Sequence, residues 1–240
     1  MELTADFQNV IEGAKRFWVP EFGLERTDTM VQQALALFGR LLPELPDVGG
    51  EKNWDAKFIP IAAWCVALYG PMRKAGKTAE DVGCLVYELN KSSLVDRCDE
   101  NAIAERDNFF SQEYSDKMRV WAEWTQKREY PANWVAKFIT GDGEEFDYGY
   151  DYSECALVKY FKAQGVPELA PYMCVNDFPN SSCISSGLWR TKTIAQGDDI
   201  CNFRYKKDRP VVQDWSTEIG VIRLRQSRSG IGGAPVGRNA

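Results

Sequence analysis

The segment Phe146-Asp147-Tyr148-Gly149-Tyr150-Asp151-Tyr152 alternates aromatic side chains with small or acidic ones. This alternation puts the aromatic rings on one face of an extended strand and predicts a half-buried β-strand. Residues 134–140, just before it, are rich in β-formers, and Gly141-Asp142-Gly143-Glu144 has the composition of a turn. The sequence therefore predicts a β-hairpin over residues 134–152.

A second alternating pair lies further along the chain. Residues 188–195 and 200–205 alternate on either side of Gly197-Asp198-Asp199 and predict a second hairpin. Between the two hairpins, residues 154–164 predict a helix that Gly165 ends, and Pro167 favours the start of another. We expect an antiparallel sheet of two hairpins with intervening helices.

The chain before the first hairpin is predominantly helical in pattern. The segments that predict helices are residues 30–42, 54–68, 78–94 and 112–128. Helices first and hairpins later predict an α+β fold in which an N-terminal helical layer packs on the C-terminal sheet. We expect a single α+β domain over residues 1–206, helical over 1–130 and hairpin-rich over 131–206.

Residues 207–240 are expected to form a C-terminal extension. Glycine and arginine recur from Gly220 onward, which predicts a flexible basic tail from about residue 220. The arginines are few and spaced apart, so a solvated tail is favoured over a patch for membrane or nucleic acid.

Composition restricts the function further. The 240 residues are 44% hydrophobic and 27% charged, with 35 acidic against 29 basic side chains and a net charge of −6, as in a globular protein with a sizeable core. The negative charge argues against nucleic acid as a partner. No apolar run reaches the ~20 residues of a membrane span. The first residues lack a signal-sequence pattern, so a cytoplasmic protein that acts on a small molecule is expected. The oligomeric state stays open.

Histidine is absent from the chain. This excludes Ser-His and Cys-His arrangements and histidine-bound zinc or haem, so acid–base chemistry falls to Asp, Glu, Cys, Lys or Tyr. The seven cysteines are an odd number without a Cys-x-x-Cys pair. They are expected to be thiols rather than a disulfide framework, and the sequence predicts neither a metal nor a cofactor.

Local patterns single out several reactive groups, each with a structural alternative. Cys155 lies where a strand gives way to a helix, whose N-terminus can lower a thiol pKa, although a small buried residue is the favoured interpretation. Asp177, three residues after Cys174 on the expected helix, could be a general base or a capping residue. Arg190 could hold a substrate carboxylate or belong to a solvent-facing row of charges.

Tyr148, Tyr150 and Tyr152 project from one strand face. They could stack on a planar ligand, although packing in an aromatic core is favoured.

Three stretches together suggest a family: Gly165-Val166-Pro167-Glu168-Leu169, Gly187-Leu188-Trp189-Arg190-Thr191-Lys192-Thr193-Ile194-Ala195-Gln196-Gly197 and Cys201-Asn202-Phe203-Arg204-Tyr205. With Cys155, Cys174 and Asp177, they resemble the L-2-amino-thiazoline-4-carboxylic acid hydrolase family over about residues 134–206. The resemblance implies a hydrolase that opens a cyclic, amidine-like thiazoline carboxylate at its C=N carbon to give N-carbamoyl-L-cysteine.

The resemblance also implies site residues. The catalytic candidates are Cys155, Asp177 and Cys201. The resemblance implies Arg190 and Thr193 as substrate-binding candidates, and the local patterns add Arg204, Cys174 and Tyr150. One departure is visible, because Asn202 stands where the family pattern has aspartate.

Two chemical routes are open at this point. Asp177 could activate water, or Cys155 or Cys201 could attack as a nucleophile and form a covalent adduct that water resolves. Two other functions also remain. The chain could be a relative recruited to another ring-opening, ring-closing or isomerising step on a small heterocycle, or a non-catalytic module that binds a small molecule.

Overall fold

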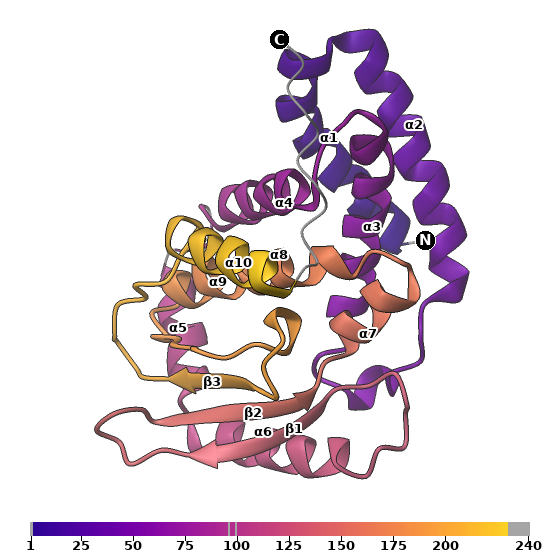
Figure 1. Cartoon of the computed structure of the whole chain (residues 1–240). Coiled ribbons are helices and arrows are strands. Elements are labelled where there is room, and N and C mark those ends of the chain that lie inside the picture. Colours follow the sequence, from indigo (N-terminus) through magenta and orange to yellow (C-terminus); the bar gives the residue numbers. More distant parts are fainter. Residues whose placement is uncertain (1, 96, 99, 230–240) are drawn as a thin grey trace.

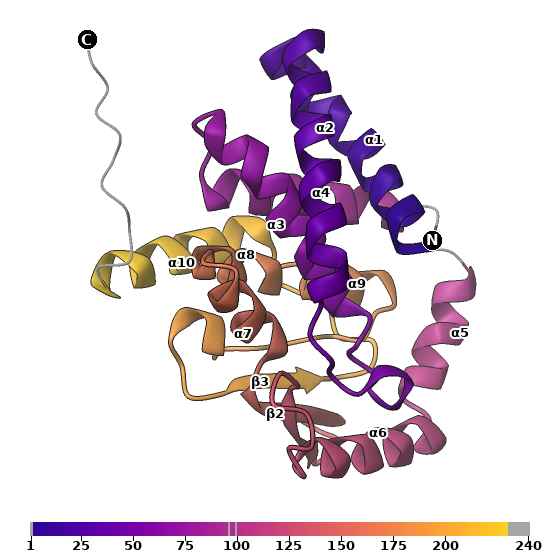
Figure 2. The same cartoon turned by 90° about the vertical axis from the view of Figure 1, so that its right-hand side faces the viewer.

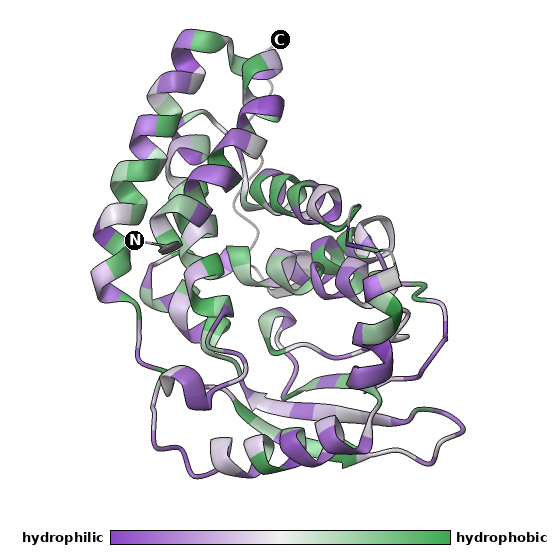
Figure 3. Ribbon diagram, turned by 180° about the vertical axis from the view of Figure 1, so that it is seen from behind, coloured by the Kyte–Doolittle hydropathy of each residue, from purple (hydrophilic) through white to green (hydrophobic). Residues whose placement is uncertain are grey.

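Long helices form the N-terminal part of the structure, a computed structural model that describes residues 2–95, 97–98 and 100–229. These helices are α1 (Glu2–Phe22), α2 (Leu24–Leu41), α3 (Phe58–Lys74) and α4 (Ala79–Leu94). They form the upper layer of Figure 1 and pack around fully buried side chains such as Trp18, Phe38 and Leu68. In Figure 3 both hydrophobic and hydrophilic residues follow one another along α2, whose buried residues recur at helical spacing and form one side, whereas α3 is apolar along most of its length and buried among its neighbours.

Helix α4 illustrates how the local sequence fixes an element. The Thr78 hydroxyl accepts a hydrogen bond from the Asp81 amide, and the Asp81 carboxylate accepts one from the Thr78 amide. This capping box satisfies two amides that the first helical turn leaves without partners. The predicted start of a helix at residue 78 is thereby confirmed.

Helices α5 (Glu100–Phe109) and α6 (Gln112–Thr125) connect the helical layer to the sheet (Figure 2). Two short 3₁₀ helices, η1 (Leu42–Glu44) and η2 (Gly50–Lys52), lie in the connection between α2 and α3. Helix α6 packs on the first strand of the sheet, with Met118 and Trp121 buried at that contact.

The antiparallel sheet has the order β1 (Val135–Thr140), β2 (Tyr148–Glu154), β3 (Cys201–Tyr205). The first predicted hairpin and the α+β class are confirmed. Tyr148 and Tyr150 are buried against α6, so the aromatic face forms a packed core, as the composition favoured.

The second hairpin differs from the prediction, because residues 188–195 do not form a regular strand. Trp189 makes an isolated bridge to β3, and Ile194–Gln196 form the 3₁₀ helix η4. The backbone N–H and C=O of Arg190 bind the side-chain amide of Gln213 at 3.0 and 2.8 Å. These two groups are therefore not available to a strand partner.

Short helices link β2 to β3: α7 (Ala156–Ala163), η3 (Pro167–Leu169), α8 (Ala170–Cys174) and α9 (Asp177–Cys183). The two helices predicted between the hairpins are confirmed by α7 and by η3 with α8. Helix α9 is an element that the sequence pattern did not predict. Pro179 falls in the first turn of α9, where its missing N–H costs no helical hydrogen bond.

The C-terminal helix α10 (Trp215–Ser229) corrects the expected tail. Ile222 is fully buried, Arg223 pairs with Glu80 of α4, and Arg225 pairs with Asp198. Residues 220–229, which the sequence assigned to a flexible tail, are therefore helical here, with Ile222 buried and with Arg223 and Arg225 paired to acidic side chains. Residues 230–240 lie outside the described part of the chain. Nowhere in the described chain is there a helix with the length and apolar character needed to cross a membrane.

A disulfide joins Cys98, in the α4–α5 connection, to Cys183 at the end of α9. Their Cα atoms lie 5.0 Å apart although 85 positions separate them in sequence. The expectation that all seven cysteines are thiols is therefore wrong for this pair, because the fold brings together two residues with no local pattern in common. The remaining five cysteines are free.

Removing this disulfide is expected to lower the free energy of unfolding by about 4 kcal/mol, because the link restricts a long loop in the unfolded chain. The midpoint of urea unfolding of the wild type should move to a lower urea concentration when reductant is added. The variant C98S/C183S should have this lower midpoint whether or not reductant is present. As a control, Cys84→Ser, at a free cysteine, should keep the sensitivity to reductant. A wild-type midpoint that reductant leaves unchanged would contradict the prediction.

Candidate functional site

Arg190 lies at the centre of the candidate site, and only 4% of its surface is exposed. Its Nη1 donates to Oδ2 of Asp177 at 2.6 Å, and its Nη2 donates to the backbone carbonyl of Cys174 at 2.8 Å. The guanidinium carbon lies 4.7 Å from the ring centre of Phe203 and 5.1 Å from that of Phe178. The arginine therefore ties together the end of α8, the start of α9 and strand β3.

Around Arg190 lies a group that we call the interior cluster. Its members are Asp55, Tyr152, Cys155, Cys174, Asp177, Arg190, Cys201 and Tyr205. They come from segments far apart in the sequence, yet their charges are close enough to shift one another's pKa. Of the sequence-predicted site residues, Arg190 contacts Asp177 and the Cys174 carbonyl directly. Cys201 lies near enough to Arg190 and Asp177 for their charges to affect its pKa, and Cys155 is related in the same way to Cys174 and Cys201.

The three thiols of the cluster share one property. Burial raises the pKa of Cys155, Cys174 and Cys201 to about 12 in each case. For Cys155 a lowered pKa was the less favoured of the two possibilities, and its raised pKa shows that possibility to be wrong. The backbone N–H groups of Leu157 and Val158, at the start of α7, do lower it, but burial has the larger effect. At pH 7 about one thiol in 10⁵ would be a thiolate.

Asp177 is the accessible acid of the cluster. Burial raises the pKa of its carboxyl group above the ordinary value, and the ion pair with Arg190 opposes that rise. Even so, 39% of the side-chain surface is accessible. The expected helix face shared with Cys174 is not formed, because α8 ends at Cys174 and α9 begins at Asp177. Instead, the two residues meet through Arg190.

Asp55 is a cluster member that the sequence analysis did not select. It lies between η2 and α3, is 6% exposed, and accepts a hydrogen bond from the Tyr152 hydroxyl at 3.2 Å. Burial raises its pKa to about 7, while Tyr152 and Lys57 lower it and Asp177 raises it further. Neighbouring residues give no signal of this role, because the hydroxyl that binds Asp55 is 97 positions away.

A network around Asn53 holds Asp55 in place. The Asn53 Oδ1 accepts hydrogen bonds from the Asp55 amide and from Trp121 Nε1, both at 3.1 Å. Its Nδ2 donates to the Val48 carbonyl at 2.7 Å and to Asn133 Oδ1 at 2.8 Å. The side-chain oxygen and nitrogen of Asn53 therefore make two hydrogen bonds each, and these bonds fix the position of the segment that carries Asp55.

Two predicted substrate-binding residues carry buried hydroxyls without partners. Among the described residues, the Tyr150 hydroxyl and the Thr193 Oγ1 make no hydrogen bond, and both residues are 5% exposed. Thr193 lies beside the cluster, because the next amide, of Ile194, donates to Sγ of Cys201 at 3.2 Å. An unpaired buried hydroxyl costs about 1–3 kcal/mol, so both are groups that a polar ligand could satisfy.

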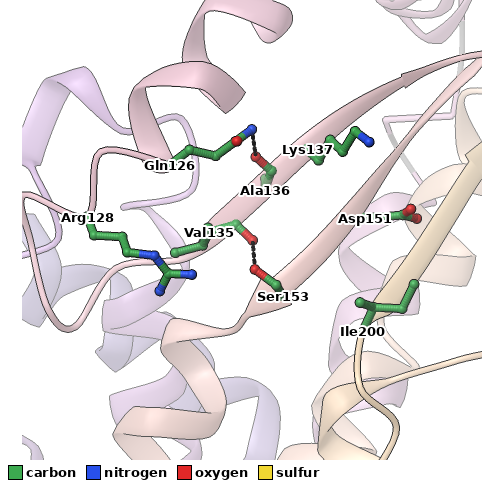
Figure 4. Close-up of a pocket in the computed structure, with 8 residues that line it drawn as sticks. All are labelled: Gln126, Arg128, Val135, Ala136, Lys137, Asp151, Ser153 and Ile200. Atoms are coloured by element: carbon green, nitrogen blue, oxygen red, sulfur yellow. Dashed lines mark hydrogen bonds between the residues drawn. The ribbon is translucent and has the colours of Figure 1, made fainter.

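Arg204 is not brought to the cluster. Alternation along β3 puts it on the opposite face of the sheet from Phe203, where its Nη1 pairs with Asp151 at 2.8 Å. On that same outer face lies a pocket of about 390 Å³, whose wall includes Lys137, Asp151 and Ser153 (Figure 4). None of the predicted catalytic residues lines this pocket.

Asn202, which stands where the sequence comparison led us to expect aspartate, also lies on the outer face of the sheet. Its Oδ1 accepts from the amides of Thr191 and Lys192, at 3.0 and 2.7 Å, and its Nδ2 donates to the Thr191 hydroxyl at 3.0 Å. Asn202 therefore holds the segment after Arg190 against β3. An aspartate here could accept the same two amide bonds, so asparagine retains this positioning role without adding a charge to the cluster.

Metal binding finds no support in the donor arrangement. Within the residues that the structure describes, no group of three or more cysteine, aspartate or glutamate side chains is arranged to hold a metal ion.

The comparison with known families identifies the chain. The L-2-amino-thiazoline-4-carboxylic acid hydrolase family matches residues 57–205, and the chain belongs to this family. The match includes every predicted site residue and excludes Asp55. No curated protein and no solved structure gave a significant match.

The buried carboxyl of Asp55 predicts a pH dependence of stability. Its pKa is about 7 in the folded protein, against an ordinary value of 3.8 for an aspartate in water. The folded state therefore holds the proton more tightly, so this contribution to stability is fully present below pH 4 and is lost as the pH rises through 7. The difference corresponds to up to about 4 kcal/mol.

Urea unfolding between pH 4 and 8 should show this decline in the wild type, and Asp55→Asn should flatten it. Asp142, whose pKa is lowered by backbone amides, offers a matched control, because Asp142→Asn should leave the decline in place. An unchanged slope in Asp55→Asn would show that another group causes it.

Proposed function

We propose that the chain is a hydrolase that opens a small cyclic carbon–nitrogen substrate of the thiazoline carboxylate type. The observation that carries this proposal is the convergence of Cys174, Asp177 and Cys201 on the buried Arg190. Cys155 lies beside this group, close to Cys174 and Cys201. These residues come from several segments of a chain that belongs to a family named for this reaction.

The protonation states favour water activation over a cysteine nucleophile. Thiols with a pKa of about 12 are almost entirely protonated near neutrality, and the sequence gives Cys155 and Cys201 no histidine to accept a proton. Asp177 has a raised pKa and an accessible carboxylate, which suits a general base. We therefore assign to Asp177 the activation of the attacking water.

In this reaction, the oxygen of water bonds to the ring carbon that lies between nitrogen and sulfur. Asp177 takes one proton from the water and passes it to the ring nitrogen. The adduct then breaks its carbon–sulfur bond as the carbonyl forms, its hydroxyl loses the second proton of the water, and sulfur gains one proton. One water is consumed, and the product carries a carbamoyl group and a free thiol.

Binding would use groups that the fold leaves unsatisfied. The hydroxyls of Thr193 and Tyr150 are buried without partners in the described chain and could bond the polar edge of the ring. Both terminal nitrogens of Arg190 already donate to protein groups, so a substrate carboxylate would share this guanidinium with Asp177.

The test is release of thiol from L-2-amino-thiazoline-4-carboxylic acid, followed with a thiol-reactive dye. Asp177→Asn should lower kcat by roughly 100-fold or more, because the general base is lost. Cys155→Ala and Cys201→Ala should each keep turnover within about tenfold of the wild type, since neither thiol forms a bond to the substrate. Asp151→Asn, on the outer face of the sheet, serves as the matched control.

Three outcomes would count against this assignment. Loss of turnover in a cysteine variant, with a substrate adduct on that cysteine in the mass spectrum, would replace water activation by the covalent route. A wild type that binds the ring without consuming it would favour a binding module. Conversion to a product without a free thiol would favour another step on the heterocycle.

A further inference from the structure

Tyr152 lies between Asp55 and the rest of the interior cluster. Its hydroxyl donates to Oδ2 of Asp55, and its ring centre lies 5.3 Å from that of Phe203, the ring on which Arg190 rests. In the sheet register, Tyr152 is paired directly with Cys201. Asp55, although only 6% exposed, is thus connected through one hydroxyl to the groups around Asp177.

We propose that Asp55 and Tyr152 form the acid side of the active site: Asp55 supplies, through the Tyr152 hydroxyl, the proton that sulfur takes up when the ring opens. This inference rests on the proposed function and adds a catalytic hydroxyl and a proton donor that lies outside the matched residues 57–205. Asp177 is then the base and Asp55 the acid of the same reaction.

The protons balance over one turnover. Asp55 begins protonated and Asp177 ionised. With Asp55 protonated, the hydrogen bond runs from the Asp55 carboxyl group to the Tyr152 oxygen, the reverse of its direction when Asp55 is ionised. Tyr152 then gives its own proton to the departing sulfur and receives one from Asp55. As the carbonyl forms, the second proton of the attacking water returns to Asp55 through Tyr152, and Asp177 has already passed the first to the ring nitrogen. Both carboxyl groups end as they began.

The surroundings of Asp55 suit a proton donor near neutral pH. Burial raises the pKa of Asp55 to about 7, so a large fraction of this carboxyl group is protonated near neutral pH. Burial also raises the pKa of Tyr152 well above its ordinary value, so its hydroxyl is protonated at rest. The titratable groups whose charges bear on Asp55 are Lys57, Tyr114, Tyr150, Tyr152, Cys155, Asp177 and Tyr205. Lys57 favours the ionised form, whereas the ionised form of Asp177 opposes it.

The kinetic test is a double-mutant cycle with Asp55→Asn and Tyr152→Phe, measured as thiol release from L-2-amino-thiazoline-4-carboxylic acid. Each single variant should lower kcat by roughly 100-fold, and the double variant should lose little more than either, because both act on one proton path. Asp55→Glu should recover part of the rate. Tyr148→Phe, on the same strand face and bonded to the Phe109 carbonyl, is the matched control and should stay near the wild-type rate.

The pH profile separates a catalytic from a structural role. Wild-type kcat should fall as the pH rises through about 7, because the acid must be protonated, and Asp55→Asn should lack this descending limb. The inference would be overturned if the kcat losses of the two single variants multiplied in the double variant. It would also be overturned if the descending limb of the pH profile persisted in Asp55→Asn.

A measurement without turnover distinguishes this inference from the proposed function. In ¹³C NMR of labelled aspartate, the carboxyl signal that disappears in Asp55→Asn should titrate near neutral pH. Its midpoint should fall in Asp177→Asn, because a neighbouring negative charge is removed. A midpoint that Asp177→Asn does not move would overturn the paired site even if thiol is released. If the Asp55 midpoint does fall in Asp177→Asn but the protein releases no thiol, the paired site stands and only the proposed thiazoline reaction is overturned.

Discussion

A guanidinium group can be buried only with partners, and the way Arg190 meets this requirement fixes much of the C-terminal half. Its charge is balanced by Asp177 at the first residue of α9, and its second terminal nitrogen binds the carbonyl that closes α8. The rings of Phe178 and Phe203 cover it. Because these partners come from two helices and a strand, removing the arginine would remove one set of contacts that all three elements share.

Burial has opposite chemical consequences for the two kinds of acid in the cluster. It raises the pKa of the thiols away from neutrality, and that of Asp55 toward neutrality. The same environment therefore keeps the thiols protonated, and so poor nucleophiles, while it gives Asp55 a carboxyl group that can exchange protons near pH 7. In a chain without histidine, this is a physical route to acid–base chemistry at ordinary pH.

Local patterns predicted the features that neighbouring residues determine, such as the first hairpin and the helix that Gly165 ends. The family resemblance led us to expect Cys155, Asp177 and Cys201 in one site. Features set by distant contacts were not predictable in this way. Asp55 acquires its environment from a tyrosine 97 positions away, and the disulfide of Cys183 spans 85 positions. The pKa of Cys155 followed burial, which the helix N-terminus alone could not reveal.

The Arg-Thr-x-Thr-Ile-Ala-x-Gly stretch serves mainly as a frame for the site. After Arg190, the amide of Thr193 binds Asp198, and Gly197 adopts a positive φ of 95°, which glycine accommodates without strain. Asn202 holds the same segment by two amide bonds from the outer face. An aspartate at this position could accept the same two amide hydrogen bonds, so the frame does not depend on the charge of this residue. Asp177 is held by Arg190 of this stretch, whereas Asp55 is held by Asn53, so separate parts of the fold position the two carboxyl groups of the proposed site.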